Sequence, residues 1–318
     1  MLWKKHGKIF DPTDHSLPFE CSEFAQSPQT LVFDDYVRIY FSTRRKDPLN
    51  GKYFSDVAFV DVDRNFHIVN CSRQPVIALG GLGCFDEHGI FPMHVLRHDG
   101  RIWAYTTGWS RRVSISVDLS TGLAFSHDDG LTFQRYGTGP VLTSSLHEPV
   151  LVGDSFVRVY GGVFHMWYIF GRKWREAQDG EALVRCYKIA HATSADGIHW
   201  KKEEGVRIIS DVFGEDENQA LPTVHQIGDR YHMYFCYRQA TDFRTNPARG
   251  YRLGYAYSDD LQHWTRDDER GGMKFSDSGW DSEMMCYPHL FEWHGKVYLL
   301  YNGNAFGKYG FGLAELVS

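Results

Sequence analysis

Long apolar runs and paired cysteines are missing from this chain of 318 residues. No run approaches the roughly 18 apolar residues that a membrane-spanning helix needs, so we expect no membrane span. The first residues, Met1 to His6, lack the apolar stretch of a signal peptide. The six cysteines include no C-x-x-C pair, so we predict reduced thiols in a cytoplasmic protein and no zinc site.

An excess of basic residues is also missing. Lys and Arg number 34 against 40 Asp and Glu, which gives a net charge of −6. Nucleic acid is therefore excluded as the main partner, because phosphate neutralisation needs a basic face. No segment keeps a 3.6-residue apolar period, which argues against an α/β fold. The oligomeric state leaves no signal in the sequence.

Aromatic residues, in contrast, are abundant at 15% of the chain, and a glutamate five residues before a proline recurs along it. The pairs are Glu23–Pro28, Glu87–Pro92, Glu217–Pro222 and Glu283–Pro288. Successive glutamates are 64, 130 and 66 residues apart, so the middle interval holds two periods. We expect the missing unit around Pro149, where Ser144 takes the glutamate's place and Glu148 stands beside the proline. A period of this size predicts a repeat architecture, and the deviating unit is a natural place for chemistry.

Each unit is predicted to form four short strands. After the proline comes an apolar stretch, a tight turn and an aromatic stretch, as in Val224 to Ile227, Gly228-Asp229 and Tyr231 to Phe235. Such turns between β-rich runs are hairpin signals. An A-x-S-x-D-G-x-x-W segment, clearest from Ala192 to Trp200, supplies a third strand and the start of a fourth. Four strands in each of five units predict an all-β fold, a five-bladed β-propeller.

We predict one domain over residues 1–318, with blades at roughly 20–72, 84–140, 141–210, 213–270 and 278–318 plus 1–10. The last unit is one strand short. The segments Leu2-Trp3 and Lys8 to Phe10 offer β-compatible residues for the missing outer strand. An N-terminal segment that closes the last blade in this way hides open sheet edges.

In a propeller, the loops into the first strands and those between the second and third strands should surround one funnel. Its acidic members are Glu23, Asp86, Glu87, Glu148, Asp216, Glu217, Asp281 and Glu283. Glycosidic cleavage uses such carboxylates: one protonates the leaving oxygen, and another acts as nucleophile or activates water. A second interpretation stays open, in which each repeated glutamate accepts backbone hydrogen bonds and holds its loop.

Basic, aromatic and histidine side chains are expected around the same funnel. The second set of loops contains Trp109, Arg44, Arg111, Arg172, Lys173, Arg238 and Asn302. Arginine suits carboxylate or phosphate, which favours an anionic substrate unless these arginines are solvated or pair with funnel carboxylates. Trp109 is a candidate for stacking on a sugar ring. Histidines at positions 88, 94, 147, 225 and 289 either contact an anion or a metal, or are hydrogen-bonded structural residues.

These motifs resemble the five-bladed propeller glycosidase superfamily, which includes arabinanases, β-xylosidases, invertases and β-mannoside phosphorylases. The resemblance covers the whole chain and is carried by Ala192 to Trp200, His147-Glu148-Pro149, and Trp280 to Glu283 followed by Tyr301 to Asn304. Phe85 to Pro92 looks most like the phosphorylases and the glycosyl hydrolase-like proteins of polysaccharide gene clusters.

The resemblance implies a carboxylic acid on the third blade, for which Glu148 is the best match. Arabinanases and invertases carry an aspartate before the first blade's proline, where this chain has Ser22 to Pro28 with Glu23 as its carboxylate. Phosphorylases of the superfamily use a single acidic residue and bind phosphate through basic residues. The resemblance also allows a structural or channel metal ion, although no ligand motif supports one, and no other cofactor is expected.

We therefore expect a carbohydrate-active enzyme that cleaves or transfers a glycosidic bond of an anionic, nucleotide-linked or phosphate-linked sugar. Glu148 or Asp86 is the candidate general acid, with Glu87, Glu217 and Glu283 shaping the site. The substrate-binding candidates are Glu23, Arg44, Trp109, Arg111, Arg172, Lys173, Arg238, Asp281, His289 and Asn302. Hydrolysis, phosphorolysis and transfer all stay open. The alternatives are a non-catalytic carbohydrate-binding propeller and a protein-interaction propeller with an exposed apolar top.

Overall fold

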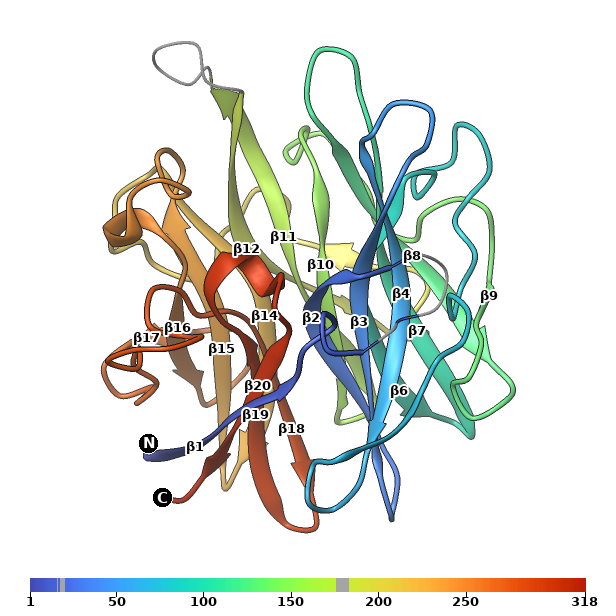
Figure 1. Cartoon of the computed structure of the whole chain (residues 1–318). Helices are drawn as coiled ribbons and strands as arrows, with labels where there is room; N and C mark the ends of the chain where they lie inside the picture. The colour runs from blue at the N-terminus through green and yellow to red at the C-terminus, as the bar shows by residue number, and fades with distance from the viewer. Residues whose placement is uncertain (16, 18–20, 176–182) are drawn as a thin grey trace.

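The computed structural model describes residues 1–15, 17, 21–175 and 183–318 (Figure 1). Its regular elements are strands, apart from the short 3-10 helices η2 (Pro247–Arg249) and η3 (Asn304–Gly307). The all-β prediction is confirmed. No helix in the described part of the sequence is long and apolar enough to cross a membrane.

Consecutive strands pair antiparallel, so that each sheet is a local meander. The first group contains β2 (Glu23–Val32), β3 (Val37–Lys46), β4 (Tyr53–Val62) and β5 (Ile68–Cys71). The second contains β6 (Gly89–His98), β7 (Arg101–Ser110), β8 (Asp118–Ser126) and β9 (Gln134–Arg135). One parallel bridge between Ser55 and Gly89 joins these two groups into an eight-stranded sheet.

Three four-stranded sheets follow along the sequence. One contains β10 (Val152–Tyr160), β11 (Val163–Arg175), β12 (Val184–Ser194) and β13 (Lys201–Lys202). The next contains β14 (Glu217–Ile227), β15 (Arg230–Gln239), β16 (Arg252–Ser258) and β17 (Thr265–Arg266). The last contains β18 (Cys286–Trp293), β19 (Lys296–Asn302), β20 (Phe311–Leu316) and β1 (Trp3–Phe10).

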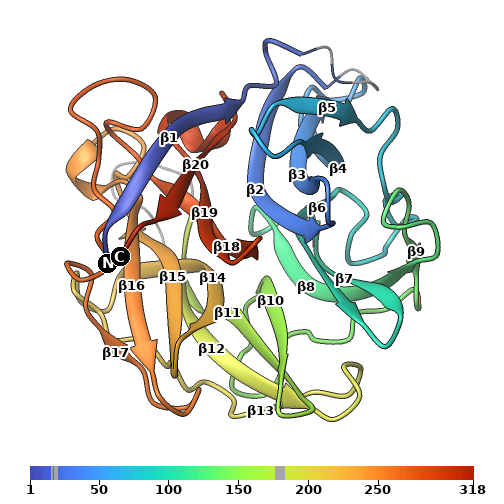
Figure 2. The same cartoon turned by 90° about the horizontal axis from the view of Figure 1, so that it is seen from below.

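The N-terminal strand thus occupies the outer place that the sequence predicted for it. Trp3 lies opposite Leu316 and Phe10 opposite Phe311 in the antiparallel pair of β1 and β20. The amide of Leu2 also donates to the carbonyl of Ser318 at 2.7 Å. The two termini consequently lie side by side at one edge of the molecule (Figures 1 and 2).

The first strands of the groups contact one another in a circuit, from β2 to β6, β10, β14 and β18 and back to β2. Figure 2 shows the sheets arranged around this central axis. Apolar side chains fill the spaces between neighbouring sheets. Phe156 and Trp167, for example, share a buried cluster with Val224 and Met233 of the next sheet.

Tight turns join the first and second strands, as the turn residues predicted. Asp99 and Gly100 have φ values of 47° and 69°, and His294 and Gly295 have values of 50° and 71°. Two successive positive φ angles match the right-handed twist of a hairpin, and glycine supplies one of them without steric cost.

Every first strand has a bulge at the position of the repeated proline. The irregularities fall between Gln26 and Gln29, Ile90 and Met93, Gly153 and Phe156, Ala220 and Thr223, and Cys286 and His289. In β10 the proline's place is taken by Ser155, whereas Pro149 lies before the strand. The third unit is therefore aligned on Ser155. A bulge changes the direction in which nearby side chains point. The bulge of β10 orients a side chain of the candidate site described below.

Candidate functional site

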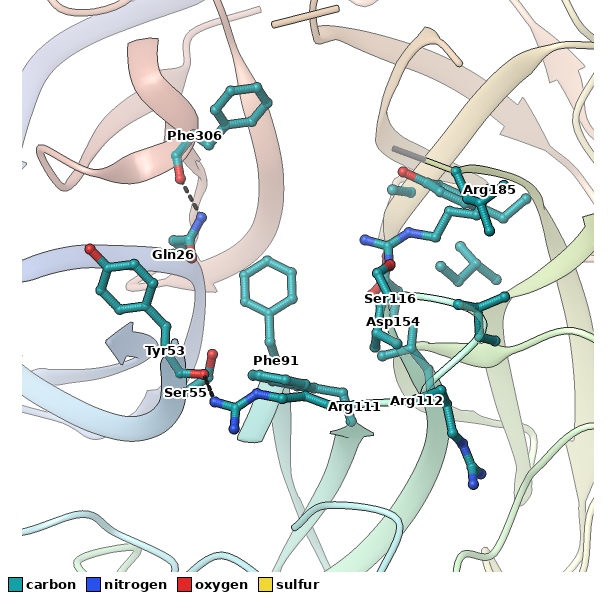
Figure 3. A pocket seen from close by; sticks show the side chains of 18 of the residues that line it. Gln26, Tyr53, Ser55, Phe91, Arg111, Arg112, Ser116, Asp154, Arg185 and Phe306 are labelled. Carbon is teal, nitrogen blue, oxygen red and sulfur yellow. Dashed lines mark hydrogen bonds between the residues drawn. The ribbon is translucent and has the colours of Figure 1, made fainter. Parts of the chain in front are cut away.

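A cavity of about 870 Å³ opens where the first strands begin (Figure 3). Its aromatic lining includes Phe24, Tyr53, Phe91, Trp109, Tyr187, Phe243, Tyr251, Tyr287 and Phe306. Its basic lining consists of Arg44, Lys52, Arg111, Arg112, Arg185, Arg238 and Arg244. Among the described lining residues the only carboxylate is Asp154. The cavity is thus a cationic, aromatic pocket with a single acid.

Asp154 reaches the cavity from the bulge of β10, where its φ is 52°. Its side chain is 6% exposed, and Oδ2 accepts a hydrogen bond from the amide of Leu221 at 3.3 Å. Burial raises the pKa of Asp154 from 3.8 to about 7, although the Leu221 N–H and the charge of Arg185 act to lower it. A carboxyl group with this pKa can both give and take a proton near neutral pH.

The equivalent bulge positions of two other strands also face the cavity. Phe91 of β6 and Tyr287 of β18 line it and contact each other edge to face, with ring centroids 5.3 Å apart. The repeat therefore places one bulge side chain from each of three sheets in the wall of the cavity. Only in β10 is that side chain an acid.

Arg238 is the most enclosed of the cavity's arginines, at 5% exposed. Its guanidinium lies 3.5 Å from the ring centroid of Phe243 and donates to the hydroxyl of Tyr187 at 3.1 Å. Its Nε has no partner among the described residues. Arg238 is therefore stacked and buried, and its Nε–H has no hydrogen-bond acceptor among the described residues. A ligand can supply that acceptor.

Four arginines of the cavity, at positions 44, 185, 238 and 244, have no carboxylate within ion-pair distance among the described residues. Arg44 donates to Gln26 Oε1 at 3.0 Å and lies over the ring of Phe24. Burial lowers the pKa of Arg44, since removal from water penalises its charge. Uncompensated positive charge of this kind favours an anionic ligand.

Arg111 and Trp109, both predicted to bind substrate, also line the cavity. Arg111 is already engaged: it donates to Asp47 Oδ2 at 3.2 Å and to the carbonyl of Tyr53 at 2.7 Å. In Figure 3, Gln26 and Tyr53 lie on one side of the cavity, across from Asp154 and Arg185, and the guanidinium of Arg111 reaches toward Tyr53. Of the predicted binding residues, the structure brings Arg44, Trp109, Arg111 and Arg238 together.

Three predicted catalytic carboxylates and the predicted binding residue Asp281 lie elsewhere. Glu148 is fully buried, accepts a hydrogen bond from Tyr168 at 2.8 Å and forms an ion pair with Lys202 at 2.6 Å. Glu217 pairs with Arg266 at 2.6 Å. Asp86 accepts from Arg135 at 2.9 Å, and Asp281 pairs with Lys5 at 2.7 Å. None of these carboxylates lines the cavity.

These four ion pairs are a repeated structural element. Each basic partner stands two residues after an aromatic residue in the outermost strand of its sheet, in Phe133-Gln134-Arg135, Trp200-Lys201-Lys202, Trp264-Thr265-Arg266 and Trp3-Lys4-Lys5. The carboxylate thus ties the start of a first strand, or the segment just before it, to the outer edge of the same sheet. Glu217 is the repeated glutamate in this set, and it also accepts hydrogen bonds from the amides of Val212 and Phe213 at 2.9 Å, which supports the architectural interpretation for that residue.

The other predicted acids make local contacts and do not line the cavity. Glu23 pairs with Lys308 at 3.1 Å, and Glu87 accepts from the amide of Gly83 at 3.1 Å. Glu283 is exposed, and its amide donates to Asn304 Oδ1 at 2.9 Å. The predicted roles of Glu23 in substrate binding and of Glu87 and Glu283 in shaping the site find no geometric support.

The remaining predicted binding residues are also outside the cavity lining. Arg172 and Lys173 are exposed, and Lys173 lies 3.8 Å from Asp216. Asn302 is buried; its Oδ1 accepts from the amide of Ser27, and its Nδ2 donates to the carbonyls of Ala25 and Gly310. Asn302 therefore links the last sheet to the first.

His289 is buried and hydrogen-bonded to Thr30. Within the described residues, no group of three or more His, Cys, Asp or Glu could hold a metal ion.

Sequence reasoning missed Asp154, Arg185 and Arg244. A signal for Asp154 existed, since a period of about 65 residues counted from Pro92 falls near Ser155 and well past Pro149. Asp154 directly precedes Ser155 and so holds the bulge position. No comparable signal marks Arg185, which is the second residue of β12, or Arg244, which belongs to the loop after β15.

The fold is that of the propeller glycosidase superfamily, as the motifs predicted. A structure described as "Glycoside hydrolase" superposes with a TM-score of 0.73 at 16% identity, covering 98% of this protein and 92% of the other. A thermostable family-43 glycoside hydrolase gives 0.64 at 11% identity, covering 95% and 90%. The endo-arabinase of Bacteroides thetaiotaomicron gives 0.62 at 13% identity, covering 96% and 98%.

Relatives with higher sequence identity occur in Mycobacterium tuberculosis. The protein MT1551 of strain CDC 1551 / Oshkosh and the protein Rv1502 of strain ATCC 25618 / H37Rv, both described as uncharacterized, are each 32% identical over 317 residues. The alignment covers 99% of the present sequence and 99% of each relative. The protein belongs to the family of these two mycobacterial proteins. No protein-family model matches it.

Proposed function

We propose that the protein is a five-bladed β-propeller with a single domain, and that it is a carbohydrate-active enzyme acting on an anionic sugar. The circuit of first strands supports five blades, with the eight-stranded sheet counted as two blades joined by one bridge. The blades then follow the sequence boundaries, with residues 1–10 completing the last.

One observation carries the functional proposal: a single protonatable carboxyl, Asp154, lies in a cavity lined by aromatic rings and unpaired arginines. Aromatic faces suit sugar rings, and arginine forks suit phosphate or carboxylate. The anionic part of the substrate would bind Arg44, Arg238 and Arg244. Trp109 would contact the sugar.

Asp154 is the proposed general acid. In its protonated form it donates its proton to the leaving oxygen while the glycosidic C–O bond breaks and a nucleophile attacks the anomeric carbon. Two-carboxylate hydrolysis needs a second carboxyl group about 5–9.5 Å away. The described lining offers none, so we favour a nucleophile that the arginines themselves bind, such as inorganic phosphate.

The second candidate is a non-catalytic carbohydrate-binding protein. It is favoured by the same lack of a second carboxylate among the described lining residues. A protein-interaction surface is less well supported, because the cavity is charged rather than an exposed apolar face.

The test is a turnover screen over aryl glycosides, nucleotide sugars and acidic glycans, with and without phosphate. We expect turnover that depends on phosphate in the wild type and is lost in Asp154→Asn. The matched control is Glu148→Gln, which removes a buried acid outside the cavity and should retain turnover. Binding measured by calorimetry without any turnover would favour the non-catalytic candidate. Loss of activity in Glu148→Gln with retention in Asp154→Asn would overturn the assignment of the acid.

A further inference from the structure

A second cluster of donors lies along the central axis, farther down the same strands. Asp154 is near the start of β10 and Arg158 is near its end, so about 13 Å of extended strand separates them. His94 of β6 and His289 of β18 face the same region, where the rings of both contact Phe156 with centroid distances of 4.3 and 5.9 Å.

His289 presents a buried N–H that has no acceptor. The amide of Thr30 donates to its Nε2 at 3.1 Å, so this nitrogen carries a lone pair. Burial, with the nearby His94, Arg158 and His225, holds the pKa of His289 well below its usual range, so the ring is neutral. A neutral ring with an accepting Nε2 carries its proton on Nδ1. This Nδ1 is buried in a side chain that is 0% exposed, and it has no partner among the described residues.

Arg158 supplies uncompensated charge to the same region. Its guanidinium lies 4.5 Å from the ring centroid of Phe156 and has no carboxylate within ion-pair distance in the described part of the sequence. Its Nη1 is 3.5 Å from the carbonyl of Val157, at the limit of a hydrogen bond. His94 Nε2 lies 2.9 Å from that same carbonyl and 3.4 Å from Arg158 Nη1. With its proton on Nε2, directed at the carbonyl, His94 offers Arg158 no acceptor.

The remaining charged groups at this end do not neutralise Arg158. His225 has a lowered pKa because of burial, and its Nε2 lies 3.3 Å from Glu292 Oε2. Glu292 is half exposed and pairs with this histidine rather than with the guanidinium. An unpaired arginine and an orphan imidazole N–H therefore remain together in a largely enclosed place, which is costly unless an acceptor occupies it.

We propose that a small inorganic anion of halide size binds on the central axis, beside Phe156, between His289 Nδ1 and the Arg158 guanidinium. Both groups are hydrogen-bond donors. The aromatic rings that lie close to these two groups favour a small ion over a phosphate. The same arrangement does not fit a cation: a metal ligand must present a lone pair, whereas His289 presents N–H and Arg158 adds positive charge. This site is separate from the cavity and does not depend on the proposed activity.

Bromide is the probe. Crystals of the full-length protein soaked in sodium bromide should show an anomalous peak within hydrogen-bond distance of His289 Nδ1 and Arg158. In solution, chloride should raise the Tm saturably against gluconate at equal ionic strength, because gluconate is too large for the site. Arg158→Met keeps the apolar stem over Phe156 and should raise the half-saturating chloride concentration about tenfold or more.

The control variant is Arg101→Met, which removes an exposed arginine and should leave the chloride response unchanged. Wild-type crystals that show only a water at this position would overturn the proposal, whatever the stability of the variant. A peak that persists undiminished in Arg158→Met, or an equal chloride response in all three proteins, would overturn it too.

Discussion

Replacing Asp154 by asparagine should have opposite effects on catalysis and on stability, and the structure gives the size of each effect. Asparagine keeps the shape of the side chain and can still accept the Leu221 N–H through its carbonyl oxygen. It cannot ionise, however, so it removes the proton that we assign to catalysis. We expect kcat to fall about 10²–10⁴-fold, the usual contribution of a general acid.

The same substitution should stabilise the fold at high pH. The pKa of Asp154 is 3.8 in an ordinary environment and about 7 in the folded protein. Because the folded-state value is the higher one, stability from this group is present below about pH 4 and is lost as pH rises through 7. At ~1.36 kcal/mol for each tenfold change in proton affinity, ionised Asp154 costs the fold on the order of 4 kcal/mol at pH 8.

Asp154→Asn should therefore have a Tm roughly 6 °C above that of the wild type at pH 8, given ~2.1 cal/mol/K of unfolding entropy per residue. At pH 4 the difference should shrink to less than about 1 kcal/mol. Thermal and urea unfolding from pH 4 to 8 measure this stability difference between the variant and the wild type. The kcat/KM of the wild type should fall above about pH 7. A variant that is less stable at every pH, or a stability difference that does not change with pH, would refute the reasoning.

Three further outcomes follow from the same contacts. Glu148→Gln should lower stability by about 3–5 kcal/mol, because Lys202 loses its buried partner, while kcat changes little; urea unfolding and turnover together decide this. Arg238→Lys should raise KM for an anionic substrate about tenfold or more, since lysine loses the planar stack on Phe243, and a circular dichroism spectrum like that of the wild type confirms the fold. Deleting residues 1–8 should expose the edge of β20 and bury less of the core, so size-exclusion chromatography should show oligomers; a monomer with unchanged Tm contradicts the role of β1.

The strands were predictable because their signals are local. Turn pairs such as His294-Gly295 specify hairpins through the backbone conformations that they allow, and continuous apolar and aromatic runs specify strands that are buried on both faces. The outer place of β1 was predictable as well, because the last repeat lacked one strand and the N-terminus offered β-compatible residues.

The candidate site was predicted only in part, because an acidic residue in a repeat has the same sequence signature whether it meets a ligand or an arginine. Glu148 and Glu217 were assigned to the funnel, yet each is held by a basic residue from the outer strand of its own sheet. The aromatic-x-basic spacing could have revealed these pairs. Aligning the third unit on Pro149 also kept Asp154 from being recognised, because a shift of a few residues in the alignment changes which residue is expected at the bulge.

The pairing of β1 with β20 has a consequence for how the protein folds as it is made. β1 is synthesised long before its partner β20, because the strands of all the other sheets lie between them in the sequence, so β1 stays unpaired while the intervening sheets form. Closing a loop on the order of 300 residues costs about 5 kcal/mol of conformational entropy, which only an already assembled ring reduces. The seam between the two termini should therefore close last and open first, and new termini introduced at another hairpin should let it form early.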